Sequence, residues 1–135
     1  MHQDRLLHAE LTDRILRAYY HVYNALGFGF LEKVYEGALF RTLQKNGLAV
    51  LRQTPINVWF EDEIVGEYFA DLIVENLIII ELKVAKSLGE DHESQLVNYL
   101  KSTQLEVGLL LNFGPKPEFK RRVFANCRKP SFKQD

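Results

Sequence analysis

The sequence predicts an α/β fold in which a central mixed sheet carries helices on its faces. The first observation is a change in hydrophobic period near Gly47, from steps of three and four residues to alternation. The second is the resulting order of elements, which is helix, helix, a run of strands, helix and strand. The third is size, since 135 residues of which 47% are hydrophobic suit one compact domain over residues 1–135.

Two helices are expected in the first third of the chain. Apolar residues recur at helical spacing over residues 7–26 and again over residues 30–46. Gly27 predicts the end of the first helix, because glycine accepts the left-handed backbone that often follows a last turn. The Asn-Gly pair at residues 46–47 closes the second helix, and a third helix is expected over about residues 91–102.

The alternating part of the chain predicts strands. They are expected over residues 48–53, 56–60, 64–74, 77–84 and 106–112, with a short element over residues 122–125. Pro55 separates the first two strands, because proline lacks the N–H group that a ladder needs. The strand over residues 77–84 is apolar on both faces except at Glu81 and Lys83, which is typical of the centre of a sheet.

Composition excludes several classes of protein. The single cysteine, Cys127, has no partner for an internal disulfide, which favours a reducing compartment. One cysteine and four scattered histidines make no zinc pattern. Residues 77–80 form the longest apolar stretch, far shorter than the roughly 20 residues that cross a bilayer, and residues 1–10 contain no signal-peptide core. We therefore expect a soluble, cytoplasmic protein that binds no membrane.

Charge is distributed unevenly along the chain, although the net charge is only −1. Residues 1–115 contain 10 Lys and Arg against 16 Asp and Glu, whereas residues 116–135 contain seven against two. The basic cluster includes Lys116, Lys120, Arg121, Arg122 and Lys133. One interpretation is a solvated tail, which a charge run alone favours, and the other is an arm that binds nucleic-acid phosphates.

Three ionisable residues stand inside strongly apolar strands. Asp71 lies in one strand, and Glu81 and Lys83 lie two residues apart in the next, so that the latter two share a face. A hairpin brings Asp71 beside them, where two carboxylates can hold a divalent cation through oxygen ligands. The residue types alone fit equally well a buried bridge between Lys83 and the carboxylates, with no ligand.

The metal interpretation requires one particular strand register. A turn made of residues 75 and 76 alone would set Asp71 opposite Ile80, and Asp71 would then face away from Glu81. A three-residue connection over residues 75–77, or a bulge, sets Asp71 opposite Glu81. We predict the second register.

Polar residues on two of the helices are candidates for the same site. Glu32 and Tyr35 share a helix face just after Gly29, although an acidic residue at a helix N-terminus is also favourable by itself. A polar stripe on the later helix is formed by His92, Gln95 and Tyr99. A lone histidine at such a position is usually a surface residue. The three residues together, rather than His92 alone, therefore suggest part of a functional site.

The chain resembles a known family over nearly its whole length. The segment from Gly29 to Tyr35 matches the motif of the GxxExxY proteins, a branch of the PD-(D/E)XK nuclease superfamily. The similarity continues through Asp71, residues 81–83, residues 92–101 and residues 107–114. The Glu-x-Lys element alone is weak evidence for the family, whereas the occurrence of all these segments in this order is specific to it. Ala70 stands where the name of the superfamily has proline, and the resemblance implies that the aspartate that follows is the ligand.

The resemblance implies a restriction-endonuclease-like αβββαβ core and a metal site within it. Asp71 and Glu81 would be ligands of Mg²⁺ or Mn²⁺, together with a main-chain carbonyl near Leu82. Lys83 would orient or activate the attacking water and stabilise the charge that develops on the phosphate.

The resemblance also implies roles for residues on the helices. Glu32 would reach the metal directly or through water. Gln95 and Tyr99 are similar to a Gln-x-x-x-Tyr element that lies beside the active site in some branches. His92 would contact phosphate or substrate.

The sequence thus predicts a divalent-metal-dependent nuclease, a hydrolase of phosphodiester bonds whose basic segment holds flanking phosphates. DNA and RNA remain open as substrates. Phe28, Phe30 and Trp59 are expected to pack inside the protein rather than to stack on bases. The alternative is a non-catalytic module that keeps this fold and binds nucleic acid or protein, and a third hypothesis is an interaction protein that forms a homodimer through its first helix.

Overall fold

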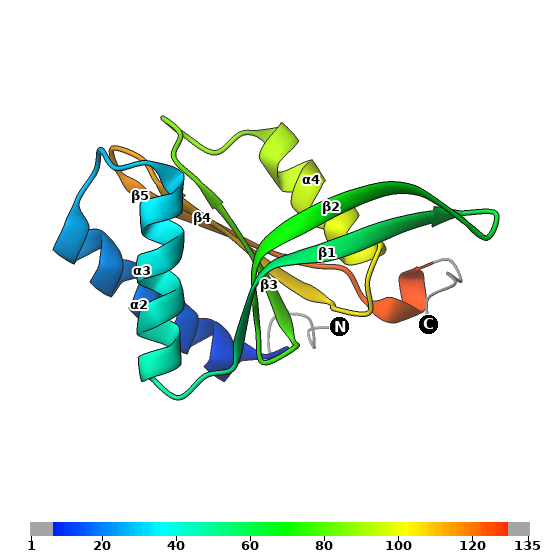
Figure 1. Cartoon of the computed structure of the whole chain (residues 1–135), viewed down its shortest axis with the longest axis horizontal. Helices are drawn as coiled ribbons and strands as arrows, with labels where there is room; N and C mark the ends of the chain where they lie inside the picture. Colours follow the sequence, from blue (N-terminus) through cyan, green and yellow to red (C-terminus); the bar gives the residue numbers. More distant parts are fainter. Residues whose placement is uncertain (1–6, 130–135) are drawn as a thin grey trace.

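A five-stranded mixed sheet forms the centre of this computed structural model, which describes residues 7–129. The elements are α2 (Ala9–Leu26), α3 (Glu32–Lys45), β1 (Val50–Phe60), β2 (Glu63–Val74), β3 (Ile78–Lys83), α4 (Glu90–Lys101), β4 (Val107–Phe113), β5 (Pro117–Val123) and the 3₁₀ turn η1 (Asn126–Arg128). The strands lie side by side in chain order, and only β3 and β4 run parallel, because α4 connects them (Figure 1). This architecture confirms the predicted α/β class.

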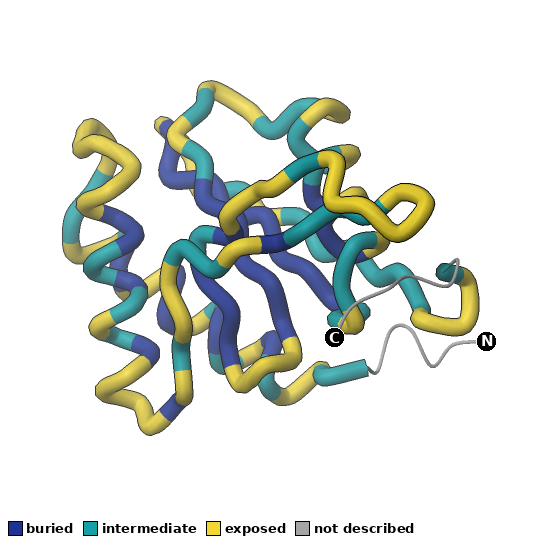
Figure 2. Tube along the Cα trace, turned by 45° about the vertical axis from the view of Figure 1, so that its right-hand side comes forward, coloured by how far each residue is buried: buried dark blue, intermediate teal, exposed yellow. Residues whose placement is uncertain are grey.

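The helices cover both faces of the sheet. Alternate residues of β3 point to opposite sides, so that Ile80 packs with α2 and α3 while Ile79 packs with α4. The same division holds in β4, where Leu109 joins the first cluster and Leu110 the second. Figure 2 shows the resulting buried strands at the centre of the molecule. Within residues 7–129, no helix is long and apolar enough to cross a membrane.

The predicted helix ends are confirmed. Gly27 follows α2 with φ +72°, and its N–H donates to the carbonyl oxygen of Tyr23. Gly47 adopts φ +86° just after α3. The apolar residues of α2 are buried inside the chain, with Ile15 and Tyr19 both at 0% exposure. That face of α2 is therefore already covered by the rest of the chain.

The prediction of two short strands around Pro55 is wrong. One continuous strand, β1, spans Val50–Phe60, and Pro55 pairs in register with Phe69 of β2. β1 lies at the edge of the sheet, so the missing N–H of proline can point outward without breaking a ladder hydrogen bond. The pairing is interrupted further along, at a register shift between Val58 and Trp59.

The predicted short element over residues 122–125 is also wrong. Pro117–Val123 forms the edge strand β5, which pairs antiparallel with β4 along its whole length. The start of the basic segment is therefore part of the sheet and neither a solvated tail nor a free arm. Lys133, which the sequence also assigned to that segment, lies outside the described residues.

Two of the three aromatic residues expected to be buried are exposed. Phe28 retains 57% and Phe30 retains 46% of its accessible surface, whereas Trp59 is half-buried. Both phenylalanines belong to the connection between α2 and α3, where the chain runs over the surface and has no second layer to cover it.

Candidate active site

The connection between β2 and β3 has the register that the metal interpretation requires. Val74 pairs with Ile78 and Leu72 pairs with Ile80, so residues 75–77 form a three-residue connection. The N–H of Leu77 donates to the carbonyl oxygen of Val74 at 2.9 Å and closes this turn. The next step along the ladder sets Asp71 opposite Glu81, as predicted.

Beyond the regular ladder, the two carboxylates take over the hydrogen bonding between β2 and β3. The main-chain N–H of Asp71 donates to Oε2 of Glu81 at 3.1 Å. The N–H of Leu82 donates to Oδ2 of Asp71 at 2.8 Å. Each carboxylate therefore binds the main chain of the opposite strand, and the two acidic groups are held together at one place.

Burial makes this pair of acids costly to ionise. Glu81 is 6% exposed, and burial, reinforced by the negative charge of Asp71, raises its pKa to about 8. Burial also raises the pKa of Asp71, although the hydrogen bonds from Leu82 and Gln53 act in the opposite direction. A positive charge placed between the two groups would relieve both effects.

Lys83 ends β3 on the same face as Glu81 and is half-buried. Its charge opposes the rise in the pKa values of Glu81, Asp71 and Glu32. Within residues 7–129, however, Lys83 makes no ion pair within 4.0 Å, so the buried lysine–carboxylate bridge considered as the alternative is not formed. Its ammonium group remains available for a ligand.

Asn112 holds the chain just beyond Lys83. It lies opposite Lys83 on β4 and is completely buried. Its side-chain amide accepts a hydrogen bond from the N–H of Ala85 and donates one to the carbonyl oxygen of Ala85, both at 2.9 Å. These two bonds fix the end of β3 and thus the place from which the lysine extends.

Glu32 is the first residue of α3 and approaches the acidic pair from another element. Partial burial of its carboxyl group and the charge of Asp71 raise its pKa, although the residue as a whole is exposed. It does not complete a metal-binding group: in the part of the chain that the structure describes, no three His, Cys, Asp or Glu side chains lie close enough to hold an ion.

Tyr35 has a structural role in the Gly-x-x-Glu-x-x-Tyr segment. It is fully buried, its hydroxyl donates to the carbonyl oxygen of Gly27, and it accepts the N–H of Phe30 at 3.2 Å. The tyrosine thereby fixes the connection that leads into α3, and with it the position of Glu32.

The residues of the polar stripe on α4 separate into two groups. Tyr99 is 5% exposed, and burial together with the charges of Glu81 and Asp71 raises its pKa to about 12, which places it near the acidic pair. Gln95 is half-buried one turn earlier and makes no hydrogen bond with the pair within residues 7–129. His92 instead accepts the N–H of Gly89 through Nδ1 at 3.2 Å, and so caps the start of α4.

A sequence model of the PD-(D/E)XK nuclease superfamily matches residues 9–122. The chain belongs to the PD-(D/E)XK nuclease superfamily. Among solved structures, the crystal structure of SSO0001 matches with a TM-score of 0.54 and 18% identity, over 90% of this chain. The matched part is 61% of that chain, and the likeness concerns the fold. No curated protein matches significantly.

Sequence reasoning missed three residues that support the acidic pair of this nuclease-superfamily site. Gln53 donates through Nε2 to Oε1 of Glu36 at 2.9 Å and to Oδ1 of Asp71 at 3.2 Å. Glu36 is 2% exposed and also pairs with Arg52 at 3.2 Å. Gln53 reaches both acids from a left-handed backbone with φ +48° inside β1. The sequence gives little signal for these residues, because β1 also contains the polar residues Thr54 and Asn57, so that Arg52 and Gln53 do not stand out.

The basic residues proposed as nucleic-acid contacts differ in their availability. Lys116 is exposed and Lys120 is half-buried on β5. Arg121 donates through Nη2 to the carbonyl oxygen of Leu7 at 2.7 Å. Arg122 forms an ion pair with Glu93 of α4. The two arginines therefore already hold parts of the protein together.

Proposed function

We propose that this member of the PD-(D/E)XK superfamily is a divalent-metal-dependent nuclease of the GxxExxY branch. The observation that carries the proposal is the pairing of Asp71 with Glu81, with the unpaired Lys83 two residues further along β3. A non-catalytic descendant has no chemical reason to keep two buried carboxylates whose ionisation is unfavourable.

The donor set of the site fits a hard cation. Asp71 and Glu81 would bind Mg²⁺ or Mn²⁺ through carboxylate oxygens, together with a main-chain carbonyl near Leu82, and Glu32 would contribute through a bound water. Two carboxylates are sufficient for Mg²⁺, which commonly keeps several waters in such sites. The raised pKa values of Asp71 and Glu81 support this assignment, because a bound cation favours the ionised form of both.

When bound, the metal would supply Lewis-acid chemistry and a more acidic bound water. The residues of the chain position the other reactants. Lys83 would orient the attacking water and stabilise the negative charge that develops on the scissile phosphate. Tyr99 and Gln95 would contact the substrate beside the acidic pair. His92 lies at the start of α4, where it accepts the N–H of Gly89. Any contact between its side chain and phosphate would be made from that place.

Phosphates that flank the cleaved bond would bind along β5 and the turn that precedes it. Lys116 and Lys120 are the better candidates there, with Arg121 and Arg122 contributing from side chains that already have partners in the protein. Neutralising two phosphate contacts should reduce the slope of log K against log salt by roughly two. We therefore expect Lys116→Gln/Lys120→Gln to lower that slope, and an unchanged slope would remove β5 from the substrate interface.

The proposal is tested by cleavage of single- and double-stranded DNA and RNA in Mg²⁺, Mn²⁺ or EDTA. The wild type should cleave at least one substrate in metal and none in EDTA, and Asp71→Asn should be inactive. Glu67→Gln is the matched control, since it removes an exposed carboxylate four residues earlier on the same strand and should leave cleavage unchanged. Nucleic-acid binding with no cleavage under any of these conditions would favour the non-catalytic module instead.

A further inference from the structure

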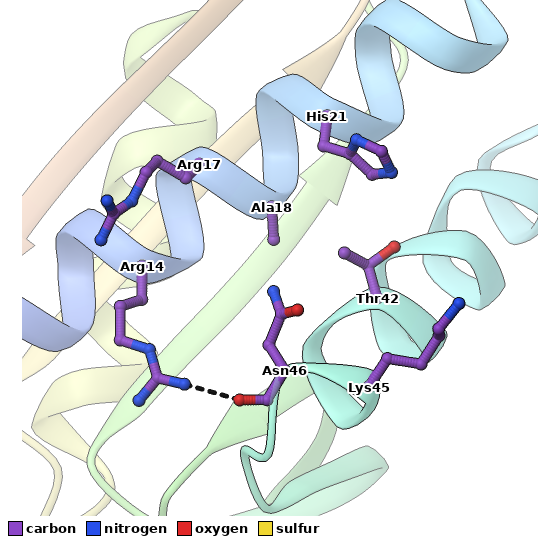
Figure 3. Close-up of a pocket in the computed structure, with 7 residues that line it drawn as sticks. All are labelled: Arg14, Arg17, Ala18, His21, Thr42, Lys45 and Asn46. Atoms are coloured by element: carbon purple, nitrogen blue, oxygen red, sulfur yellow. Dashed lines mark hydrogen bonds between the residues drawn. The ribbon is translucent and has the colours of Figure 1, made fainter.

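A cavity of about 580 Å³ lies between α2 and α3. Its lining is made of Arg14, Arg17, Ala18, His21, Thr42, Lys45 and Asn46, and we refer to it as the α2–α3 cavity. Figure 3 shows the two arginines gathered at one end and His21, Thr42 and Lys45 at the other. The small side chain of Ala18 lies between the two groups and leaves the middle open (Figure 3).

The α2–α3 cavity is positive on a protein body that is negative. No Asp or Glu lines it, and three of its seven lining residues are Lys or Arg. Residues 1–115 contain only 10 Lys and Arg in total, against 16 Asp and Glu. A concentration of cationic groups in a concave site attracts and holds anions, because the low-dielectric walls focus their field.

Several hydrogen-bond donors of the cavity are free to bind a ligand. Lys45 and His21 have no hydrogen bond or ion pair with any residue of the described part of the chain. The side chain of Asn46 points into the space between the helices (Figure 3). Arg14 uses one Nη2 donor on the carbonyl oxygen of Asn46, at 2.7 Å, which also holds its guanidinium group in place.

Two features of the cavity act against an anion, and the cations outweigh both. The last carbonyl groups of α3 carry partial negative charge at this end of the helix. Arg14 neutralises one of them by its bond to Asn46. Arg17 pairs with Asp13 at 3.1 Å, but both side chains are mostly exposed, so water screens the pair and leaves Arg17 able to exchange partners.

The cavity is separate from the candidate active site. Glu32 begins α3 beside the acidic pair, whereas Lys45 ends the same helix beside the cavity. At a rise of about 1.5 Å per residue, the two ends of the helix are about 20 Å apart. A ligand in the cavity would therefore not contact the acidic pair unless it extended over that distance.

We propose that the α2–α3 cavity is a second binding site, which takes a phosphate-bearing anion. The guanidinium, ammonium and amide donors match the several acceptor oxygens of a phosphate group. A free mononucleotide and a phosphate of a nucleic-acid strand share this chemistry, and the experiment separates the two sources.

Calorimetric titrations in EDTA test the proposal, because EDTA prevents both cleavage and metal-mediated phosphate binding. The probes are inorganic phosphate, adenosine 5′-monophosphate and a 12-nucleotide oligodeoxythymidine. We expect His21→Gln/Lys45→Gln to weaken binding at least about tenfold, the loss typical of charged hydrogen bonds. Lys45→Arg should retain it. If the double variant loses affinity for all three probes, the cavity is a site for small anions. If it loses affinity for the oligonucleotide alone, the cavity contacts a nucleic-acid strand.

Lys86→Gln is the matched control, because it removes one exposed charge outside the cavity. The proposal is overturned if the wild type binds no probe, if the double variant binds as tightly as the wild type, or if Lys86→Gln loses as much affinity as the double variant. Thermal unfolding separates binding from a purely structural role. A ligand that occupies the cavity raises the Tm of the wild type but not that of the double variant, whereas cations that merely neutralise the helix end would change the Tm without changing any affinity.

Discussion

The two ends of the β2–β3 hairpin differ in what holds the strands together. Near the turn, the pairs from Val74 and Ile78 to Leu72 and Ile80 form a regular ladder of apolar residues, all at most 6% exposed. One residue further on, the ladder stops and the carboxylates of Asp71 and Glu81 bind the main chain in its place. The change occurs within a single residue of each strand.

The difference separates stability from chemistry along one hairpin. The apolar end removes hydrocarbon from water and favours folding by about 25 cal/mol per Å² buried. The acidic end opposes folding at neutral pH, because burial raises the pKa of both carboxyl groups. Substitutions at the apolar end should therefore change stability alone, and substitutions at the acidic end should change metal binding and catalysis.

The largest effect is expected from Ile78→Ala at the apolar end. Ile78 is completely buried in the cluster formed with α2 and α3, so the truncation leaves a cavity and should lower the free energy of unfolding by about 2–5 kcal/mol. Urea denaturation measures this change. The folded variant should bind Mn²⁺ with the affinity of the wild type, and a large loss of affinity would show that the two ends are not independent.

Lys83→Ala tests the acidic end without removing a carboxylate. We expect it to retain metal binding and to lose about a hundredfold in turnover, because one positioned charge no longer stabilises the reacting phosphate. Single-turnover cleavage and calorimetry on the same samples separate the two effects. Turnover within threefold of the wild type would exclude Lys83 from the reaction.

Glu81→Gln should stabilise the metal-free protein, and the gain should grow with pH. The folded-state pKa of about 8 exceeds the usual 4.5, so the native state retains a proton that the unfolded state releases between these values. The wild type therefore loses stability as pH rises through this window, and the variant does not. We expect a gain of several kcal/mol at pH 8.5, at about 1.4 kcal/mol for each unit by which the pKa is raised, and almost none at pH 4.5, measured by thermal unfolding in EDTA.

Glu67→Gln is the control for this pH dependence. Because Glu67 is exposed, its replacement should change the free energy of unfolding by no more than about 0.5 kcal/mol at either pH. A stabilisation by Glu81→Gln that does not depend on pH would contradict the account of the acidic pair.

The smallest effect is expected from Gln53→Ala, which removes the amide that joins Asp71 to Glu36. Residues that orient a metal ligand typically change affinity by 10- to 100-fold. We expect about a tenfold loss of Mn²⁺ affinity, at the lower end of that range, because the N–H of Leu82 still binds the other carboxylate oxygen of Asp71. Gln44→Ala, an exposed glutamine of α3, is the control and should have no effect.

The acidic end could be predicted from the sequence because it depends on local alternation. Glu81 and Lys83 interrupt an apolar strand at a spacing of two, and only one register of the hairpin that joins β2 to β3 brings Asp71 to the same face. The need to bring the two carboxylates together therefore predicted the register of the hairpin. The observed pairing of Leu72 with Ile80 confirms that prediction. The fold class followed in the same way from the change of hydrophobic period.

The residues around that end could not be predicted, because their roles depend on contacts between distant elements. Gln53 meets Asp71 across 18 positions from a backbone conformation that no strand pattern reveals. Arg122 looked like a free phosphate contact, yet it pairs with Glu93 of α4. The strand β5 was missed because its basic residues hide the alternation, and Phe28 was placed inside because hydrophobicity alone does not show which loops remain uncovered.

The central claim, that Asp71 and Glu81 form a metal site, is tested most directly by calorimetric titration of Mn²⁺ into metal-free protein. The wild type and the Glu67→Gln control should bind the ion with equal affinity. The Asp71→Asn/Glu81→Gln variant should remain folded and show no binding. Equal binding by the double variant, or no binding by a folded wild type, would contradict the account.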